Sequence, residues 1–352
     1  MKNSIVILLI VGLANLAFAN SDGITVGGFV DAGYEMNPGF LETTSAGAGE
    51  AGENNRFLVN QGAFYFSKSS ENGSMHIDMP FVQNSTSGSL TFATGMAQAY
   101  VVRNLGDYKL TFGQFDTIFG FEANDSIDVF YARNGAVFGI MPVTHTGATF
   151  AGKINDSIEY TVLVGNSAST GAQSGEQADE TDPEMGLKFA YSSSQFRASL
   201  GVLSTGYSDS GCGTADCGSQ MLIDLLLGKD FGKFSVDLAV DQITNPGGDA
   251  SDASEAILGI LIDTRYNMNS EHAFGLRLEQ VTGQSSIADL PTTTVDPEEA
   301  SHTQITLGYS HKCDSDLTLK VSLESNTIVY ASGSGIEDPA WTEGQVSALF
   351  KF

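Results

Sequence analysis

The chain has 352 residues, enough for one large domain or two ordinary ones. Its 42 acidic side chains outnumber the 16 basic ones and give a net charge of −26, which disfavours nucleic-acid binding. A content of 41% hydrophobic and 10% aromatic residues argues against the disorder that is usual for so acidic a chain.

The N-terminus has the pattern of a secretory signal peptide. Lys2 supplies a positive charge, the apolar core "IVILLIVGL" follows, and "AFA", ending at Ala19, is an A-x-A cleavage site. The apolar core is too short for a membrane-spanning helix. We expect residues 1–19 to be removed on secretion across the inner membrane and residues 20–352 to form one domain.

Downstream of the cleavage site, apolar residues alternate with polar ones, which is the pattern of β-strands. In "SMHIDMPF", for example, Met75, Ile77 and Met79 share one face, and His76 and Asp78 share the other. The alternation predicts about sixteen strands. They lie near residues 24–37, 55–68, 74–83, 92–103, 108–115, 142–154, 158–165, 185–192, 196–205, 219–229, 234–244, 255–268, 272–281, 303–312, 317–326 and 344–352.

The predicted connections alternate in length. Short turn sequences such as "SENG", "NLGD" and "DFGK" are followed by long segments such as 116–141 and 282–301. Short turns at one end and long loops at the other are typical of an outer-membrane barrel, and an even strand count places both termini on the periplasmic side. The sequence therefore predicts an all-β fold, a transmembrane antiparallel up-and-down barrel.

A soluble β-sandwich is the alternative, because its strands also alternate, with the apolar face inside. Strand pattern alone does not say which face is inside. The secretion signal and the turn asymmetry both favour the barrel.

The chain ends with "GQVSALFKF", in which Val346, Ala348, Phe350 and Phe352 alternate with other residues. In a barrel these four face lipid, and this strand must pair with the first, because an open edge in lipid leaves backbone groups unsatisfied. The ending resembles the C-terminal signal that the barrel-insertion machinery reads in bacterial outer-membrane proteins. Phe350 and Phe352 are the residues that carry this resemblance.

Four blocks in the middle of the chain are more specific than strand alternation. They are a G-[KQ]-F strand end at Gly113–Phe115, "FGFE" at Phe119–Glu122, "FYAR" at Phe130–Arg133, and P-x-T-H-T-G at Pro142–Gly147. The stretch resembles the β-barrel porin-2 family, the OmpL-like porins, and "GGFVDAGYEMN" is similar to that family's first strand. The resemblance implies a general diffusion porin without catalytic residues, and porin analogy implies a homotrimer.

A barrel of this size encloses an aqueous channel, whose charges set selectivity. The predicted long loops are rich in acids and contain one base, Arg133. They form either a negative vestibule that concentrates cations, or a solvated rim that shares divalent ions with lipopolysaccharide. Salt screens such fields within about 8 Å at physiological strength, so both interpretations stay open.

We expect the loop near 116–141 to fold into the lumen. The acids predicted to line its constriction are Asp116, Glu122, Asp125 and Asp128. The bases predicted to face them from the barrel wall are Lys109, Arg197, Arg277 and Lys320. Alternatively these bases pair locally with strand acids, as Arg277 does if it binds Glu279. A substrate-specific channel would carry a run of aromatic side chains along the lumen, and no such run stands out.

Other reactive residues point to little chemistry. Cys212 and Cys217 predict a disulfide in an outer loop, since C-x4-C without a nearby His is a poor metal pattern. Cys313 is expected to be a lone thiol in a periplasmic turn. His76 beside Asp78 is the one suggestive pair for catalysis, but it lies at the periplasmic end. We therefore expect no metal, no cofactor and no enzymatic activity.

The sequence thus predicts an outer-membrane porin for passive diffusion of small hydrophilic solutes and ions, with a preference for cations. Its expected partners are outer-membrane lipid, lipopolysaccharide, the barrel-insertion machinery, the permeating solutes and two further copies of the chain. The alternative is a non-conducting barrel that acts as a surface adhesin or receptor through its acidic loops.

Overall fold

A computed structural model describes residues 23–36, 55–83, 88–166, 183–205, 220–244, 256–283, 301–329 and 340–352. The predicted signal peptide and most of the predicted long loops lie outside these residues. The strands are β1 (Thr25–Met36), β2 (Arg56–Ser70), β3 (Gly73–Gln83), β4 (Leu90–Phe92), β5 (Gln98–Leu105), β6 (Tyr108–Asp116), β7 (Thr144–Asn155), β8 (Ile158–Asn166), β9 (Pro183–Ser192), β10 (Phe196–Thr205), β11 (Gln220–Phe231), β12 (Phe234–Thr244), β13 (Ala256–Asn267), β14 (His272–Thr282), β15 (Ser301–Lys312), β16 (Leu317–Val329) and β17 (Ala340–Lys351). Two short 3-10 helices, η1 (Thr94–Met96) and η2 (Phe138–Ile140), complete the described elements.

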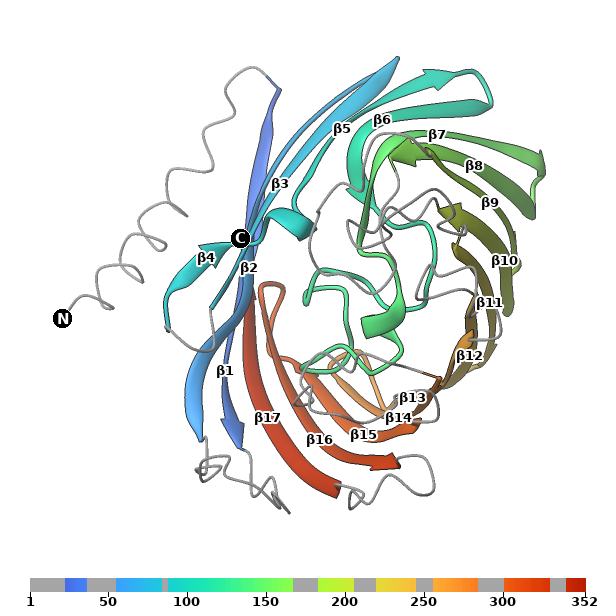
Figure 1. Cartoon of the computed structure of the whole chain (residues 1–352). Coiled ribbons are helices and arrows are strands. Elements are labelled where there is room, and N and C mark those ends of the chain that lie inside the picture. The colour runs from blue at the N-terminus through green and yellow to red at the C-terminus, as the bar shows by residue number, and fades with distance from the viewer. Residues whose placement is uncertain are drawn as a thin grey trace, which may run out of the picture.

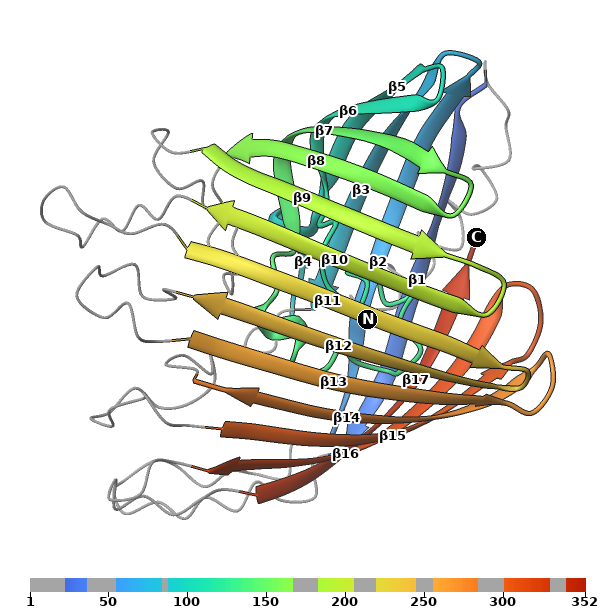
Figure 2. The ribbon, with the colours of Figure 1, turned by 90° about the vertical axis from the view of Figure 1, so that its right-hand side faces the viewer.

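The strands form a closed antiparallel barrel (Figure 1). Each long strand pairs with the next long strand along the chain, and β1 also pairs with β17, with Ala32 opposite Ala348, which closes the wall. Sixteen strands build the barrel, and the short β4 pairs with β3. Tight turns join the strands at one end (Figure 2). Two of these turns have glycines with positive φ, 67° at Gly106 and 73° at Gly232, which suit the left-handed backbone of a tight turn.

One predicted strand has different bounds. The sequence alternation suggested a strand over 92–103, whereas β5 begins at Gln98 and is preceded by η1 and β4. Both β4 and β5 pair with β3, at different heights. The turn at η1 interrupts what the alternation treats as continuous.

The two faces of the wall differ as a membrane barrel requires. In β14, Leu276 and Leu278 expose 37% and 38% of their surface, while Arg277 between them is fully buried. The same arrangement recurs around the wall, with apolar side chains outward and most charges inward. This is the reverse of a soluble sandwich, so the prediction of a barrel is confirmed. Within the described part of the chain, no helix has the length and hydrophobicity to span a membrane.

Aromatic side chains gather on the outer face close to the tight turns. They pair across neighbouring strands as Tyr108 with Phe150, Tyr191 with Phe196, Phe234 with Tyr266 and Phe274 with Tyr309. Such a girdle is typical of the membrane–water interface of a barrel.

The last strand pairs with the first, as the sequence predicted. The Phe352 amide donates to the Gly28 carbonyl at 3.0 Å, and the Gly28 amide donates back at 3.1 Å. Phe350 faces outward with 47% of its surface exposed. The role of Phe350 and Phe352 as an insertion signal stays a prediction.

Residues 117–143, here called the inner loop, enter the lumen (Figure 1). The loop packs on inward-facing apolar residues of the wall and forms a hydrophobic core inside the barrel. The buried members of this core are Phe115, Phe119, Val137, Ile140, Met141, Leu163, Leu203, Leu222, Ala239, Ile243, Ile257, Leu261 and Val281. The alternation of the strands predicted an aqueous interior and gave no indication of this core.

Candidate functional site: the inner loop and the lumen wall

The two ends of the inner loop are tied together and to the wall. The Thr117 amide donates to the Val143 carbonyl at 3.0 Å. The Thr117 hydroxyl lies 2.9 Å from Nε2 of His145, and Nδ1 of His145 lies 2.7 Å from Glu184. The His145 and Glu184 side chains are fully buried, so this hydrogen-bonded chain joins the loop to β7 and β9.

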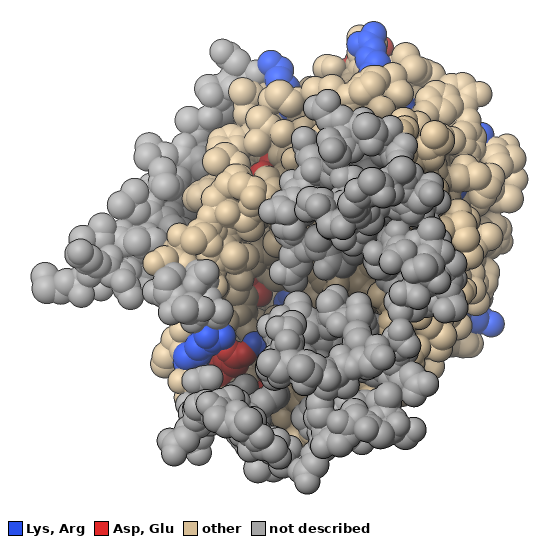
Figure 3. Space-filling view, viewed as in Figure 1, with Lys and Arg blue, Asp and Glu red and all other residues tan. Residues whose placement is uncertain are grey.

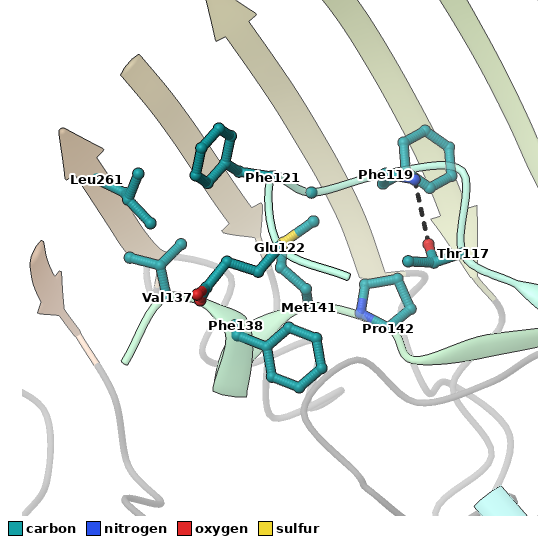
Figure 4. A pocket seen from close by; sticks show the side chains of 10 residues that line it. Thr117, Phe119, Phe121, Glu122, Val137, Phe138, Met141, Pro142 and Leu261 are labelled. Atoms are coloured by element: carbon teal, nitrogen blue, oxygen red, sulfur yellow. Dashed lines mark hydrogen bonds between the residues drawn. The ribbon is translucent and has the colours of Figure 1, made fainter. Parts of the chain in front are cut away.

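Apolar packing closes the space between the two ends of the loop. Figure 4 shows Phe119, Phe138 and Met141 around a cavity of only about 10 Å³, and the Phe119 amide donates to the Thr117 hydroxyl at 3.2 Å. A cavity of this size holds about one water molecule. The root of the loop is therefore densely packed.

Glycines on the wall make room for the aromatic side chains of the loop. A Cβ atom at Gly201 would lie 2.6 Å from the Phe119 ring, and one at Gly308 would lie 2.5 Å from the Tyr131 ring. Gly275 faces Tyr131 and Phe130 in the same way. These approaches are closer than real side chains allow, so the glycines fix where the aromatic rings dock.

Charged groups hold the middle of the loop. Arg277 of β14 is fully buried, and its guanidinium lies 2.5 Å from Glu122 of the loop and 2.9 Å from Glu279 of its own strand. Burial raises the pKa of Glu122 to about 7, although the Arg277 charge acts in the opposite direction. The Tyr131 hydroxyl donates to buried Asp263 at 2.5 Å. Loop and wall thus share one buried polar network.

Further anchors lie on β16, β17 and β1. Nζ of Lys320 donates to the carbonyls of Ser126 and Val129, at 2.5 Å each. Arg133 forms ion pairs with Glu343 of β17, at 2.9 Å, and with Glu35 of β1. The inner loop is therefore fastened across the lumen, to β9 on one side and to β1, β16 and β17 on the other.

Acids on β3, β6 and the loop meet at the part of the wall formed by β2, β3, β5 and β6. Asp125 accepts a hydrogen bond from the Tyr65 hydroxyl at 2.8 Å, and Asp116 accepts one from Asn124 at 2.7 Å. Asp78 lies opposite Tyr65 in the strand register. Burial raises the pKa of Asp125, while the hydrogen bond from Tyr65 lowers it.

The predicted constriction acids are therefore divided between two places. Glu122 belongs to the buried anchor, whereas Asp116 and Asp125 lie near Asp78 on the other side of the loop. Asp128 is exposed. The sequence grouped these acids by the loop that carries them, and it could not show that the loop turns its acids in different directions.

The predicted wall bases also differ from one another. Arg277 and Lys320 point inward but are buried under the loop, at 0% and 3% exposure, so they do not form the lumen surface. The alternative of local pairing holds for Arg277 as well, because it binds both Glu279 and the loop. Lys109 is exposed beside a tight turn, and Arg197 binds strand acids.

Two remaining predictions concern chemistry rather than permeation. The described ranges contain no group of three or more His, Cys, Asp or Glu residues arranged to hold a metal ion. The predicted disulfide between Cys212 and Cys217 lies outside the described residues. Cys313 is a free, exposed thiol in the turn between β15 and β16.

A protein-family model described as "Putative beta-barrel porin-2, OmpL-like" matches residues 23–339. The chain belongs to this porin family. No curated protein is similar enough in sequence to count as a match.

Solved outer-membrane channels share the fold of this porin. DcaP of Acinetobacter baumannii is similar with a TM-score of 0.64 and 14% identity, over 94% of this chain and 97% of that one. The anion-selective porin from Comamonas acidovorans has a TM-score of 0.60 and 14% identity, over 94% and 99%. A trimer form of OmpT from Vibrio cholerae has a TM-score of 0.56 and 12% identity, over 94% and 100%.

The geometry gives a structural role to the four blocks that carry the sequence resemblance. Gly113 has a φ of 128°, and a Cβ there would lie 2.1 Å from a backbone oxygen of β5. Phe119–Glu122 and Phe130–Arg133 supply the docked rings and the charged anchors of the loop. Pro142–Gly147 contains His145 at the root of the loop. In this porin, Gly113 fits the close pairing of β5 with β6, and the other three blocks fix the inner loop in the lumen.

Proposed function

We propose that this porin forms a passive diffusion channel for small hydrophilic solutes and ions in the outer membrane, and that it prefers cations. The observation that carries the proposal is the separation of charges inside the barrel. Inward-facing bases of β9 to β16 hold the inner loop or bind strand acids. Among the described residues, the acids beside β2, β3, β5 and β6 have no such counterions.

On the β9 to β16 side, the described bases next to the inner loop have partners. Lys188 lies 3.9 Å from Asp224 and also donates to the Ile118 carbonyl of the loop. Arg277 binds Glu122 and Glu279. Such paired charges contribute little net potential to the lumen. They act mainly as fasteners of the loop.

A cavity of about 320 Å³ lies between the loop and the wall on this side. Its two arginines are also paired, Arg197 with Asp237 at 2.6 Å and Arg265 with Asp263 at 2.7 Å. Exposed Asp128 lines the same cavity. The cavity therefore offers no surplus of positive charge that would attract anions.

On the opposite side, Asp78, Asp116 and Asp125 make no ion pair with Lys or Arg among the described residues. In Figure 3, acidic and basic atoms are both visible along the hollow beside the wall, and further basic atoms lie at the periphery. Uncompensated carboxylates near a narrow passage concentrate cations and repel anions. This supports a preference for cations. The anion-selective porin from Comamonas acidovorans is similar to this chain in fold only, so its selectivity does not speak against this proposal.

Location and assembly follow as parts of the same proposal. The predicted signal peptide, the apolar outer face and the aromatic girdle suit the outer membrane, with its lipid and lipopolysaccharide as neighbours. The trimer form of OmpT from Vibrio cholerae supports a homotrimer here. The proposed role is that of a channel without enzymatic activity, in agreement with the description of the family as porins.

Planar-bilayer recordings of the mature protein test the proposal. We expect stepwise conductance and a cation-selective reversal potential under a KCl gradient. Asp125→Asn should reduce the selectivity, while Asp230→Asn, an exposed carboxylate next to a tight turn, should change it less. An anion-selective reversal potential would contradict the charge argument, and folded protein without conductance would favour the adhesin or receptor alternative.

A further inference from the structure

Three aromatic side chains form a ladder on the inner face of the wall. Tyr65 of β2 and His76 of β3 have ring centroids 6.0 Å apart, and His76 and Tyr100 of β5 have centroids 5.2 Å apart. Their planes are inclined by only 33° and 34°, and all three rings are half-buried. The ladder thus presents partly exposed ring surface to the lumen across three neighbouring strands.

Carboxylates surround this ladder. The Tyr65 hydroxyl donates to Asp125 at 2.8 Å, and the Asp116 amide donates to the Gln98 side chain at 3.2 Å. Asp78 lies in register with both Tyr65 and Gln98, which places it between the two acids. Three acids from β3, β6 and the inner loop therefore converge on one patch of aromatic surface.

Asp78 is buried, and neither of its carboxylate oxygens has a hydrogen-bond partner among the described residues. Its residue is 1% exposed, and it points inward, since its neighbour Met79 is 43% exposed on the outer face. The Gln98 side chain and the Met79 amide lie near it, but neither makes a hydrogen bond of good geometry to its carboxylate oxygens. A buried carboxylate without a partner is costly, so this carboxyl group either keeps its proton or takes a positively charged group as its partner.

The charged groups around Asp78 do not supply that group. The nearest are Asp116 and Asp125, which are acids themselves. The acids are also not arranged as metal ligands in the described part of the barrel. The chemistry of the patch, ring faces beside carboxylates, matches a weakly hydrated organic cation better than a metal ion.

We propose that the Tyr65–His76–Tyr100 ladder and the three acids form a binding site for organic ammonium ions on their way through the channel. Ring faces attract an alkylammonium group through their quadrupoles, and the carboxylates supply the counter-charge. The proposal rests on the channel function, because the solute reaches the ladder through the lumen. It narrows the permeating cations to a chemical class.

Two measurements with tetramethylammonium as the probe test the site. Calorimetry on the detergent-solubilised protein reports binding without a need for conduction, and block of the KCl current reports occupancy in the lumen. We expect saturable binding and block by tetramethylammonium, and neither effect from sodium at the same concentration. A KCl current without tetramethylammonium binding would refute the binding site but support the channel function. Binding without a current would support the binding site but refute the channel function.

Variants separate ring, charge and fold. Tyr100→Leu should weaken tetramethylammonium binding roughly tenfold, whereas Tyr100→Phe, which keeps the ring, should retain it. Asp78→Asn should weaken binding as well, and Glu159→Gln at an exposed turn should not. His76→Leu is a second ring variant if Tyr100→Leu does not fold. Equal binding by the ring variants and the wild-type protein would refute the proposal.

Discussion

The ion pair between Arg277 and the inner loop gives the sharpest prediction. Arg277→Met keeps a long apolar side chain but removes the charge. In the structure the guanidinium lies 2.5 Å from Glu122 and 2.9 Å from Glu279, and 4.5 Å from the centre of the Tyr131 ring. The substitution leaves two buried carboxylates without their counterion.

Removal of one partner of a buried ion pair costs about 3–5 kcal/mol. Since one carboxylate belongs to the loop and the other to the wall, much of this cost falls on the docked state of the loop. The equilibrium between docked and undocked loop should then shift toward undocking by roughly a hundredfold to several thousandfold. Protonation of Glu122 reduces the cost at acidic pH, so the assay belongs above about pH 7, the pKa of this group.

Single-channel recording and thiol chemistry measure the shift. Arg277→Met should raise the conductance, because the loop no longer holds its place in the lumen. A thiol introduced by Ala132→Cys, in a background without the 3 native cysteines, should react faster with a charged thiosulfonate when Arg277 is replaced. Ala132 is 4% exposed in the docked loop, and its amide donates to Ser322, so the thiol is shielded until the loop moves.

Arg197→Met is the matched control. Arg197 has a half-exposed side chain and binds Asp230 and Asp237, both on the wall. The Arg197→Met substitution removes the same charge without breaking an anchor of the loop, so the thiol introduced at position 132 should stay shielded. If Arg277→Met leaves both the conductance and the thiol reactivity at wild-type values, the ion pair does not hold the loop and the reasoning fails.

Two further predictions concern the same anchors. Gly308→Val should displace the Tyr131 ring, break its hydrogen bond to Asp263 and destabilise the docked loop by about 3 kcal/mol, seen as raised conductance. Gly139→Val, where an added Cβ meets nothing within 4 Å, should have little effect, and an equal effect of both would contradict the packing argument. Glu122 has a pKa raised from 4.5 to about 7, so folding favours its protonated form. The stability that this bound proton contributes is fully present below pH 4.5 and is lost as the pH rises through about 7. Apparent melting temperatures between about pH 5 and about pH 8 should therefore fall less steeply for Glu122→Gln, and an unchanged slope would refute the assignment.

The barrel itself could be predicted from the sequence because its signal is local. Period-two alternation is visible within any one strand, as in the exposed Leu276 and Leu278 on either side of buried Arg277. Turn residues and the apolar last strand are equally local. Even the pairing of the last strand with the first follows from a general requirement, since a membrane barrel cannot leave an open edge.

The interior could not be predicted because its contacts are not local. Arg277 and Glu122 are separated by 155 positions, and Lys320 and Ser126 by 194. An inward-facing base has the same alternation pattern whether it faces water or anchors a loop. Inward glycines such as Gly201 and Gly308 were the available signal, because in a strand they mark a close approach of other atoms.

The aromatic ladder could not be predicted from the sequence either, because its contacts are also not local. No run of aromatic residues stood out along the sequence, because Tyr65, His76 and Tyr100 come from three different strands, and register alone brings them together. His76 and Asp78 were noticed as a pair, but as a catalytic candidate. Their position beside two tyrosines makes them more suitable for holding a cation than for transferring a proton.

Charge balance links the anchored loop to the proposed selectivity. An acidic loop that enters an acidic barrel needs inward-facing bases to stay docked, and Arg277 and Lys320 serve this purpose at 0% and 3% exposure. A buried base neutralises the acids it touches and is then hidden from the solution. Among the described residues, Asp116 and Asp125 form no ion pair with Lys or Arg, and they are left to act on passing ions. Cation preference is thus a consequence of how the loop is held, and a variant that frees a buried base should weaken the anchor and the selectivity together.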